Sequence, residues 1–178
     1  MRKLSFAFIA PILLSALLLF TSCGEAETDR LGYQDSAFSV RADITVGDMK
    51  LPVRLESSPG DTDSDPRRVK LTVLDGIISG VGFEYDGENL CLVSGGLIIP
   101  VSDPELLSGI REVISLFSID KNGFCGSAET GEGTLVTYSE DNGAKKYEVI
   151  VSDSLPKRIT ATLGERVIIA DINEFLPG

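Results

Sequence analysis

Residues 103–118, DPELLSGIREVISLFS, are the part of the chain from which the fold is most clearly read. They carry the one strong amphipathic pattern that follows the apolar N-terminal segment. At about 100° per residue, the apolar side chains fall within a sector of roughly 120°, the stripe that a core-facing helix needs. The stripe consists of Leu106, Leu107, Ile110, Val113, Ile114 and Phe117, and Leu116 lies off it. We therefore expect a helix with one buried face.

This helix has a clear beginning and strand-like surroundings. Asp103 is suited to cap the free amides of the first turn, and Pro104 suits the first helical position because it lacks an N–H. Apolar and polar residues alternate on both sides of the helix, which is the period of half-buried strands. We predict a mainly β (α+β) fold, a curved antiparallel sheet or half-barrel of about 8–10 strands packed on the helix at 103–118.

The strands are expected in two groups. Pro52 lies inside the second strand and removes a backbone donor, so that strand is expected at a sheet edge or with a bulge. Asp86-Gly87 predicts a tight hairpin, because glycine supplies the positive φ that such turns need. A glycine-rich connection is expected at 120–133. The expected strands are 38–45, 49–56, 69–73, 81–85, 90–94, 97–99, 134–139, 146–152, 157–163 and 166–172.

The chain starts with the pattern of a targeting segment. A basic N-terminus precedes an almost wholly apolar run at residues 4–20, and Thr21-Ser22-Cys23 follows directly. Small residues ahead of a cysteine resemble the lipobox of bacterial lipoproteins. In that family the cysteine sulfur receives a diacylglyceryl group, and a peptidase cuts before it. The resemblance implies a signal peptide at 1–22 and lipidation of Cys23; the alternatives are an ordinary secretory signal and an uncleaved anchor helix.

The expected domains are the signal peptide at 1–22, a lipidated acidic tether at 23–36 and a single β-rich domain at 37–176. The tether is polar and shows no periodicity. Removing the signal peptide, with its two basic and no acidic residues, leaves 156 residues and moves the formal net charge from −11 to −13. This acidity argues against nucleic acid and against electrostatic docking on anionic lipid. We expect attachment to the cell membrane through lipid on Cys23, on the extracytoplasmic side.

Residue types exclude several kinds of chemistry. The chain has no histidine, which rules out histidine-based triads and histidine-ligated zinc. It has no Walker loop and no dinucleotide glycine fingerprint. Asp61, Asp63 and Asp65 look like the start of a calcium loop, but Pro66 and Thr72 stand where such a loop needs glycine and glutamate. We expect a solvated acidic loop there, and no enzyme activity, metal site or cofactor.

Cys91 and Cys125 remain once Cys23 is assigned to lipid. Export permits a disulfide between them, while Cys91 also fits a small buried thiol in an apolar strand. Their spacing does not say whether the two sulfurs meet, and we favour two free thiols.

The order of elements carries a resemblance of its own. A hairpin at 79–87, SGVGFEYDG, is followed by a proline-flanked amphipathic helix and a four-strand meander. This order is similar to that of the lipoprotein-carrier and lipoprotein-sorting family. Over 38–175 the resemblance implies a curved antiparallel sheet that forms an open half-barrel around helices. It assigns no functional residue, because no specific motif matches.

Two hypotheses for function follow. The first is a non-enzymatic, membrane-anchored lipoprotein that binds an apolar ligand or a lipidated partner in the concave side of its sheet. The alternative is a protein-interaction or sensory module of the cell envelope, with a filled core and no ligand cavity. An empty apolar cavity on the order of several hundred Å³ would favour the first.

Overall fold

The structure is a computed structural model that describes residues 28–60 and 67–178. Some features of the sequence analysis lie outside these ranges, namely the signal peptide, Cys23, Asp61, Asp63 and Asp65. Within the described ranges, no helix is both long enough and apolar enough to cross a membrane.

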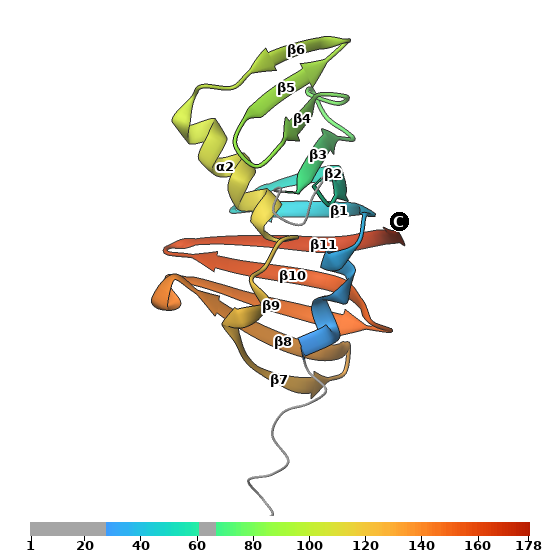
Figure 1. The fold of residues 1–178 in the computed structure, drawn as a ribbon, viewed down its shortest axis with the longest axis vertical. Coiled ribbons are helices and arrows are strands. Elements are labelled where there is room, and N and C mark those ends of the chain that lie inside the picture. The colour runs from blue at the N-terminus through green and yellow to red at the C-terminus, as the bar shows by residue number, and fades with distance from the viewer. Residues whose placement is uncertain (1–27, 61–66) are drawn as a thin grey trace, which may run out of the picture.

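In the described residues, eleven strands form one sheet in the order β6-β5-β4-β3-β2-β1-β11-β10-β9-β8-β7 (Figure 1). The strands are β1(Phe38–Val46), β2(Met49–Ser58), β3(Arg68–Val73), β4(Gly82–Tyr85), β5(Leu90–Ser94), β6(Leu97–Pro100), β7(Phe124–Thr130), β8(Gly133–Glu140), β9(Lys145–Ser152), β10(Leu155–Leu163) and β11(Arg166–Pro177). The helical elements are η2(Thr28–Asp35), α2(Pro104–Ser115), η3(Lys121–Gly123) and η4(Asp141–Gly143).

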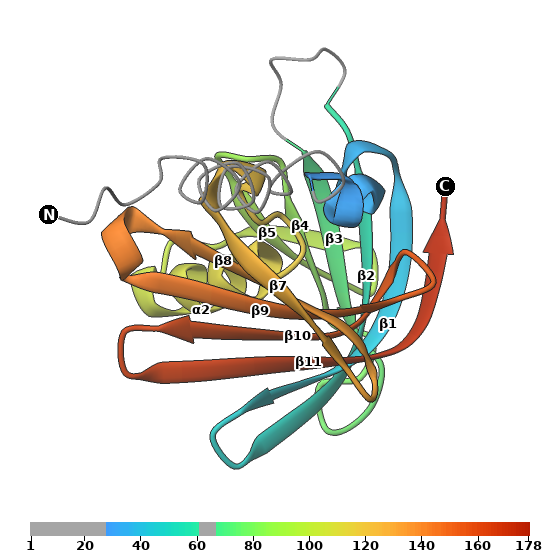
Figure 2. The same ribbon diagram turned by 90° about the horizontal axis from the view of Figure 1, so that it is seen from below.

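The first and last strands join the two halves of the sheet. β1 pairs antiparallel with β11 from Phe38 opposite Pro177 to Val46 opposite Ile168, with one register shift. The sheet curves strongly without closing, and α2 lies on the inside of the curve (Figures 1 and 2). The prediction of a mainly β, half-barrel-like sheet around one amphipathic helix is confirmed. The strand number is eleven, above the range of about 8–10 predicted from alternation.

Helix α2 begins as predicted and ends earlier. The Asp103 carboxylate accepts hydrogen bonds from the amides of Glu105 and Leu106 at 3.1 and 2.9 Å. The helix ends at Ser115, and the chain turns there. Leu116, which lies off the predicted stripe, is therefore fully buried at 0% exposure, while Leu106 on the stripe is 40% exposed.

The segment before β1 is part of the domain. In η2, Leu31 is fully buried and Tyr33 is 8% exposed. The Tyr33 ring packs edge-on against Phe38 and Phe175, with ring centroids 5.6 and 5.3 Å apart. Burial raises the pKa of the Tyr33 hydroxyl well above its usual value. The tether prediction is wrong for these residues, because a few apolar side chains suffice to dock a polar segment on the core.

Arg67 fastens this segment to the sheet. Its guanidinium donates hydrogen bonds to the hydroxyl of Ser57 at 2.9 Å and to the carbonyls of Gln34 and Ser36. It also lies 5.5 Å from the centroid of the Phe38 ring. The planar fork of donors in arginine is suited to hold several oxygens at once. The β-rich domain therefore begins before its predicted boundary.

Pro52 marks neither an edge nor a bulge. β2 lies between β1 and β3, and its register with β1 runs through Pro52 without a shift. The Pro52 carbonyl accepts a hydrogen bond from the Leu74 amide at 2.9 Å. In an antiparallel pair the missing N–H would face the Leu74 carbonyl, which instead accepts from the Ser79 hydroxyl at 3.0 Å. An internal strand tolerates this proline because a side chain replaces the lost donor.

The expected glycine-rich connection contains a strand. β7 pairs with β8 from Phe124 opposite Tyr138 to Thr130 opposite Gly133, with a register shift next to Gly126. Its sequence is poor in β-branched residues, so local preference does not reveal it. Pairing with β8 supplies the stability that the sequence pattern lacks.

Candidate functional site

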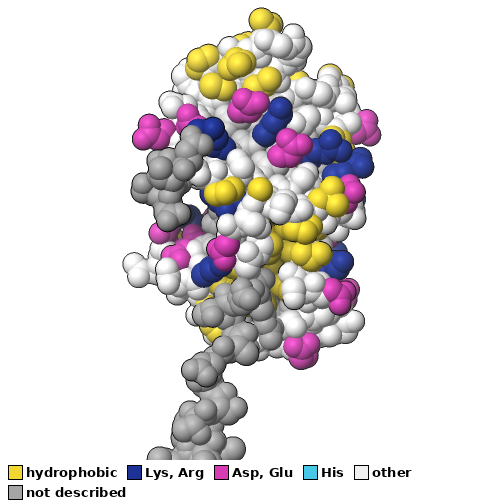
Figure 3. Space-filling view, turned by 45° about the vertical axis from the view of Figure 1, so that its right-hand side comes forward, with side chains coloured by type: hydrophobic (Ala, Val, Ile, Leu, Met, Phe, Trp, Pro, Cys, Tyr) yellow, Lys and Arg dark blue, Asp and Glu magenta, His cyan; other side chains and the backbone are white. Residues whose placement is uncertain are grey.

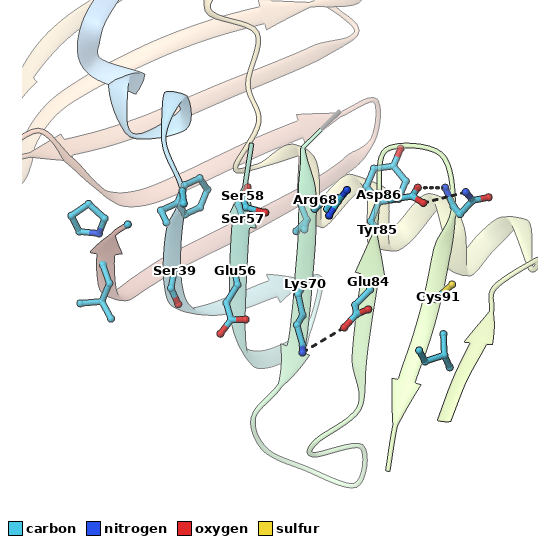
Figure 4. A pocket seen from close by; sticks show the side chains of 18 residues that line it. Ser39, Glu56, Ser57, Ser58, Arg68, Lys70, Glu84, Tyr85, Asp86 and Cys91 are labelled. Carbon is cyan, nitrogen blue, oxygen red and sulfur yellow. Dashed lines mark hydrogen bonds and ion pairs between the residues drawn. The ribbon is translucent and has the colours of Figure 1, made fainter. Parts of the chain in front are cut away.

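An open groove of about 680 Å³ crosses one face of the sheet (Figure 4). On the opposite face, Val40, Leu55 and Leu71 belong to the hydrophobic core that includes Ile114 of α2. Because successive side chains of a strand point to opposite faces, the groove lies on the side of the sheet away from the helix. We call this side the outer face and the cavity the outer-face groove.

The groove follows a row of residues that the strand register aligns. Read across the sheet from β11 to β5, the directly opposed residues are Leu176, Ser39, Glu56, Lys70, Glu84 and Cys91. All of them line the groove. Five spacings of about 4.8 Å between strands make this row about 24 Å long. Its middle carries charges of alternating sign.

The charged side chains of the row form only a weak, solvent-exposed ion pair. Lys70 Nζ lies 3.5 Å from Glu84 Oε1, and the two side chains are 49% and 46% exposed. An ion pair with that exposure stabilises the fold by about 0.2–1 kcal/mol at most. Both charges therefore remain available to a binding partner at little cost to the fold.

The turn between β4 and β5 gives the groove a well-supported rim. The Asp86 carboxylate accepts hydrogen bonds from the amides of Asn89 and Glu88 at 2.7 and 3.0 Å, and these bonds lower its pKa to about 2. Arg111 of α2 lies 5.4 Å from the centroid of the Tyr85 ring and donates to the Glu88 carbonyl at 3.0 Å. The helix thus braces the turn from behind.

The groove reaches an apolar edge of the sheet. Ile98 of β6 lines it, and β6 is the last strand on that side. Leu97, Ile98 and Ile99 are 66%, 66% and 51% exposed. Figure 3 shows apolar side chains gathered at the top of the molecule, the end at which Figure 1 places β6.

A second depression, of about 540 Å³, lies beside α2 on the inner side of the sheet. Leu107 and Arg111 of the helix line it together with Lys145 and Leu163 at the ends of β9 and β10. Deeper between helix and sheet, the space is filled by buried side chains such as Leu116, at 0% exposure. The inner side therefore offers an open depression at its rim.

The two cysteines of the β-rich domain lie far apart in the sheet. Cys91 and Cys125 are free thiols, which confirms the prediction. They lie on β5 and β7, near opposite ends of the strand order. Cys91 lines the outer-face groove, whereas Cys125 is exposed on the far edge. In the part of the chain that the structure describes, no three His, Cys, Asp or Glu side chains gather closely enough to hold a metal ion.

No pattern in the sequence singles out the groove residues. Ser39, Glu56 and Lys70 are polar positions of alternating strands, and such positions ordinarily face solvent. Only the register shows that they form one row. The alternation of apolar and polar residues along each strand predicts which of its residues share a face. It does not show which strands are neighbours in the sheet.

Comparisons with known proteins bear on the fold. No protein-family model matches the chain, and no curated protein matches it. The crystal structure of MucB is similar with a TM-score of 0.51 at 14% identity, over 87% of this chain and 60% of that one. A LolA superfamily protein from Nitrosomonas europaea gives a TM-score of 0.44 at 10% identity, over 87% and 94% of the two chains. A putative outer membrane lipoprotein-sorting domain from Vibrio parahaemolyticus gives 0.41 at 5% identity, over 83% and 90%.

The likeness to MucB concerns architecture. At 14% identity it shows a shared fold, and the chain spans about 60% of the length of MucB. The curved sheet described above is thus a known arrangement. Over most of its length, this chain has the fold of MucB.

Proposed function

We propose that this chain is a non-enzymatic, extracytoplasmic protein, anchored to the membrane by lipid on Cys23, whose β-rich domain binds another protein of the cell envelope in the outer-face groove. The observation that carries the proposal is the row from Leu176 to Cys91, which joins apolar ends to a charged middle across six strands. MucB has been crystallised in complex with MucA(peri), which is a fact about MucB. The proposal rests on the groove.

The length of the row favours an extended protein segment over a small molecule. At about 3.4 Å per residue, the row of about 24 Å matches about seven residues of extended chain. Glu56, Lys70 and Glu84 would then select a segment whose charges alternate in the opposite sense, which is how complementary charges set specificity and register. Small-molecule sites are more enclosed and carry fewer charges.

Site-specific photo-crosslinking tests the groove. A photoreactive residue replacing Ser39 in the full chain should give a defined adduct in cells, whereas one replacing Thr162, exposed on β10, should not. A second variant tests whether the charges of the groove matter. It exchanges two of them, Lys70→Glu with Glu84→Lys, and so keeps both the net charge and the ion pair between these positions. We expect the exchange to weaken the Ser39 adduct about tenfold, because like charges would then face each other. An adduct that is insensitive to the exchange contradicts the proposal.

The lipid anchor is tested separately. Cys23→Ser should abolish labelling with radioactive fatty acid and leave either uncleaved precursor or released protein. Cys125→Ser removes an exposed thiol and should leave labelling unchanged. Fatty acid retained on the Cys23 variant would show that the anchor is elsewhere.

A second candidate function is binding of an apolar ligand on the inner side of the sheet. The depression beside α2 favours it, because Leu107 and Leu163 give it an apolar lining. Mass spectrometry of the purified full chain is the test, with the covalent lipid distinguished by its mass. A co-purifying acyl chain that Leu107→Glu removes would support this candidate, and a ligand-free chain would exclude it.

A further inference from the structure

β6 is an uncovered, apolar end of the sheet. Within the described sheet it pairs with β5 alone, and no element lies above it in Figure 1. Leu97 and Ile98 are both 66% exposed, although they point to opposite faces. Proteins usually blunt an open edge with charges, bulges or proline, and β6 has only Pro100, at its end. Such an edge is a template for pairing with another strand.

The hairpin shows which β6 groups are already used. Leu97 lies directly opposite Ser94 across a two-residue turn, a position where the two residues exchange main-chain hydrogen bonds. Farther along, the Val101 amide donates to the Leu90 carbonyl at 2.8 Å. Because main-chain groups alternate in direction along a strand, those of Leu97, Ile99 and Val101 face β5.

The groups that face away from β5 are few. They belong to Ile98 and Pro100, and proline has no N–H to donate. Ile98 is therefore the one residue of β6 whose outward side offers both a donor and an acceptor. Any added strand must be centred on Ile98.

The absence of charge around β6 indicates which kind of partner can pair with this edge. No charged residue occurs between positions 90 and 102, although the chain as a whole carries a formal net charge of −11. Exposed charges are screened over a Debye length of about 8 Å at physiological salt. Two acidic copies can therefore approach here with little repulsion. A strongly charged segment would find no opposite charge on β6 and would lose hydration.

We propose that two copies of this chain pair through β6, antiparallel, about a two-fold axis at Ile98. In this register, Ile98 exchanges both main-chain hydrogen bonds with Ile98 of the second copy. Leu97 then lies opposite Ile99 of the second copy, so apolar side chains meet on both faces of the joined sheet. A two-fold contact of this kind is self-complementary and closed, which ends assembly at a dimer. This contact adjoins the outer-face groove, because Ile98 also lines the groove, but it uses none of the charged residues of the row.

Disulfide trapping in the full chain, purified in detergent, tests this pairing. The background carries Cys91→Ser and Cys125→Ser to remove the native free thiols. Hydrogen-bonded antiparallel positions have Cα atoms about 5.5 Å apart, which lies within disulfide range. Ile98→Cys should therefore give a covalent dimer under mild oxidation, and reductant should reverse it.

Neighbouring positions of β6 provide matched controls. Leu97→Cys is as exposed as the Ile98 position, at 66%, but would lie diagonally from its own mate at about 7–8 Å between Cα atoms, beyond easy bridging. Leu97→Cys and Ile99→Cys should each fail alone and should form a mixed dimer when combined. Equal cross-linking by all three single variants would indicate random collision. Either that result or no cross-link at Ile98 overturns the proposal.

A charge at the axis gives a second, independent measurement. Ile98→Asp would place two carboxylates against each other across the two-fold axis. Light scattering at high protein concentration should give a dimer for the native chain and a monomer for the variant. Equal melting temperatures would show that the variant folds, as expected for a side chain 66% exposed. A native chain that stays monomeric, or a variant that stays dimeric, contradicts pairing through β6.

Discussion

The two edges of the sheet are built in opposite ways. β6 has four uncharged residues, and its apolar side chains are more than half exposed. β7 has seven residues, a register shift next to Gly126 and a Glu129 side chain that accepts a hydrogen bond from the Thr134 hydroxyl at 2.8 Å. A bulge and a charge both discourage a further strand. The chain thus protects one edge against a further strand and leaves the other open.

The edges also differ in how they are attached. Phe124, at the start of β7, packs against the core, with its ring centroid 5.9 Å from that of Tyr138. At β6, Leu97 and Ile99 point to the inner side, opposite to Ile98, and remain 66% and 51% exposed. Phe124 therefore ties β7 to the core, whereas the exposed side chains of β6 contribute little to it.

The largest expected loss of stability is in the core, and it gives a reference value for substitutions at both edges. Leu116→Ala removes a fully buried side chain from the core and should lower the free energy of unfolding by about 2–5 kcal/mol. Leu106→Ala, at a position 40% exposed, should cost about 1 kcal/mol or less. Urea denaturation of both variants checks this. Equal losses would mean that the core does not lie where the structure places it.

The next effect compares the edges directly. Phe124→Ala on β7 should lower the free energy of unfolding by about 2–3 kcal/mol, because the ring packs on Tyr138 and on the core. Ile99→Ala on β6 should cost about 1 kcal/mol or less, since the side chain is 51% exposed. The same denaturation experiment measures both. A larger loss at Ile99 would reverse the comparison.

Substitution of glycine in the hairpin turns next to the two edges should also change stability by different amounts. A Cβ at Gly133, the first residue of β8, would lie 2.4 Å from the Val151 carbonyl oxygen, and its φ is +134°. Gly133→Ala should therefore cost about 1–3 kcal/mol. At the β5–β6 turn, Gly95 has φ +57° and open space, which asparagine tolerates, so Gly95→Asn should stay within about 0.5 kcal/mol of the native chain. Thermal melting distinguishes the two, and a destabilised Gly95 variant would contradict an open β6 hairpin.

The smallest expected effect is a change in thermal stability at low pH. Hydrogen bonds from Asn89 and Glu88 lower the pKa of Asp86 from 3.8 to about 2. A carboxyl with a lowered pKa stabilises the fold fully above its unfolded value and loses that contribution as the pH falls through its folded value. The melting temperature should therefore fall between pH 3.8 and pH 2, and Asp86→Asn should flatten that part of the curve. An unchanged slope would show that this turn does not support β4 and β5 as described.

The sequence by itself determined the local elements. The apolar stripe and its cap predicted α2, because an amphipathic period is a property of neighbouring residues. Alternation predicted ten strands and a curved sheet around the helix for the same reason. The free state of Cys91 and Cys125 was favoured but not decided, since spacing does not reveal whether two strands meet.

Tertiary structure alone decided the rest. The pairing of β1 with β11 brings together residues at the two ends of the described domain, and no local pattern announces it. β7 and η2 are formed by sequence of weak preference that gains its stability from contacts with β8 and with the core. The row from Leu176 to Cys91 exists only because six strands adopt one register. Sequence periodicity fixes which face a residue occupies, but long-range pairing fixes its neighbours, and the candidate site is made of neighbours.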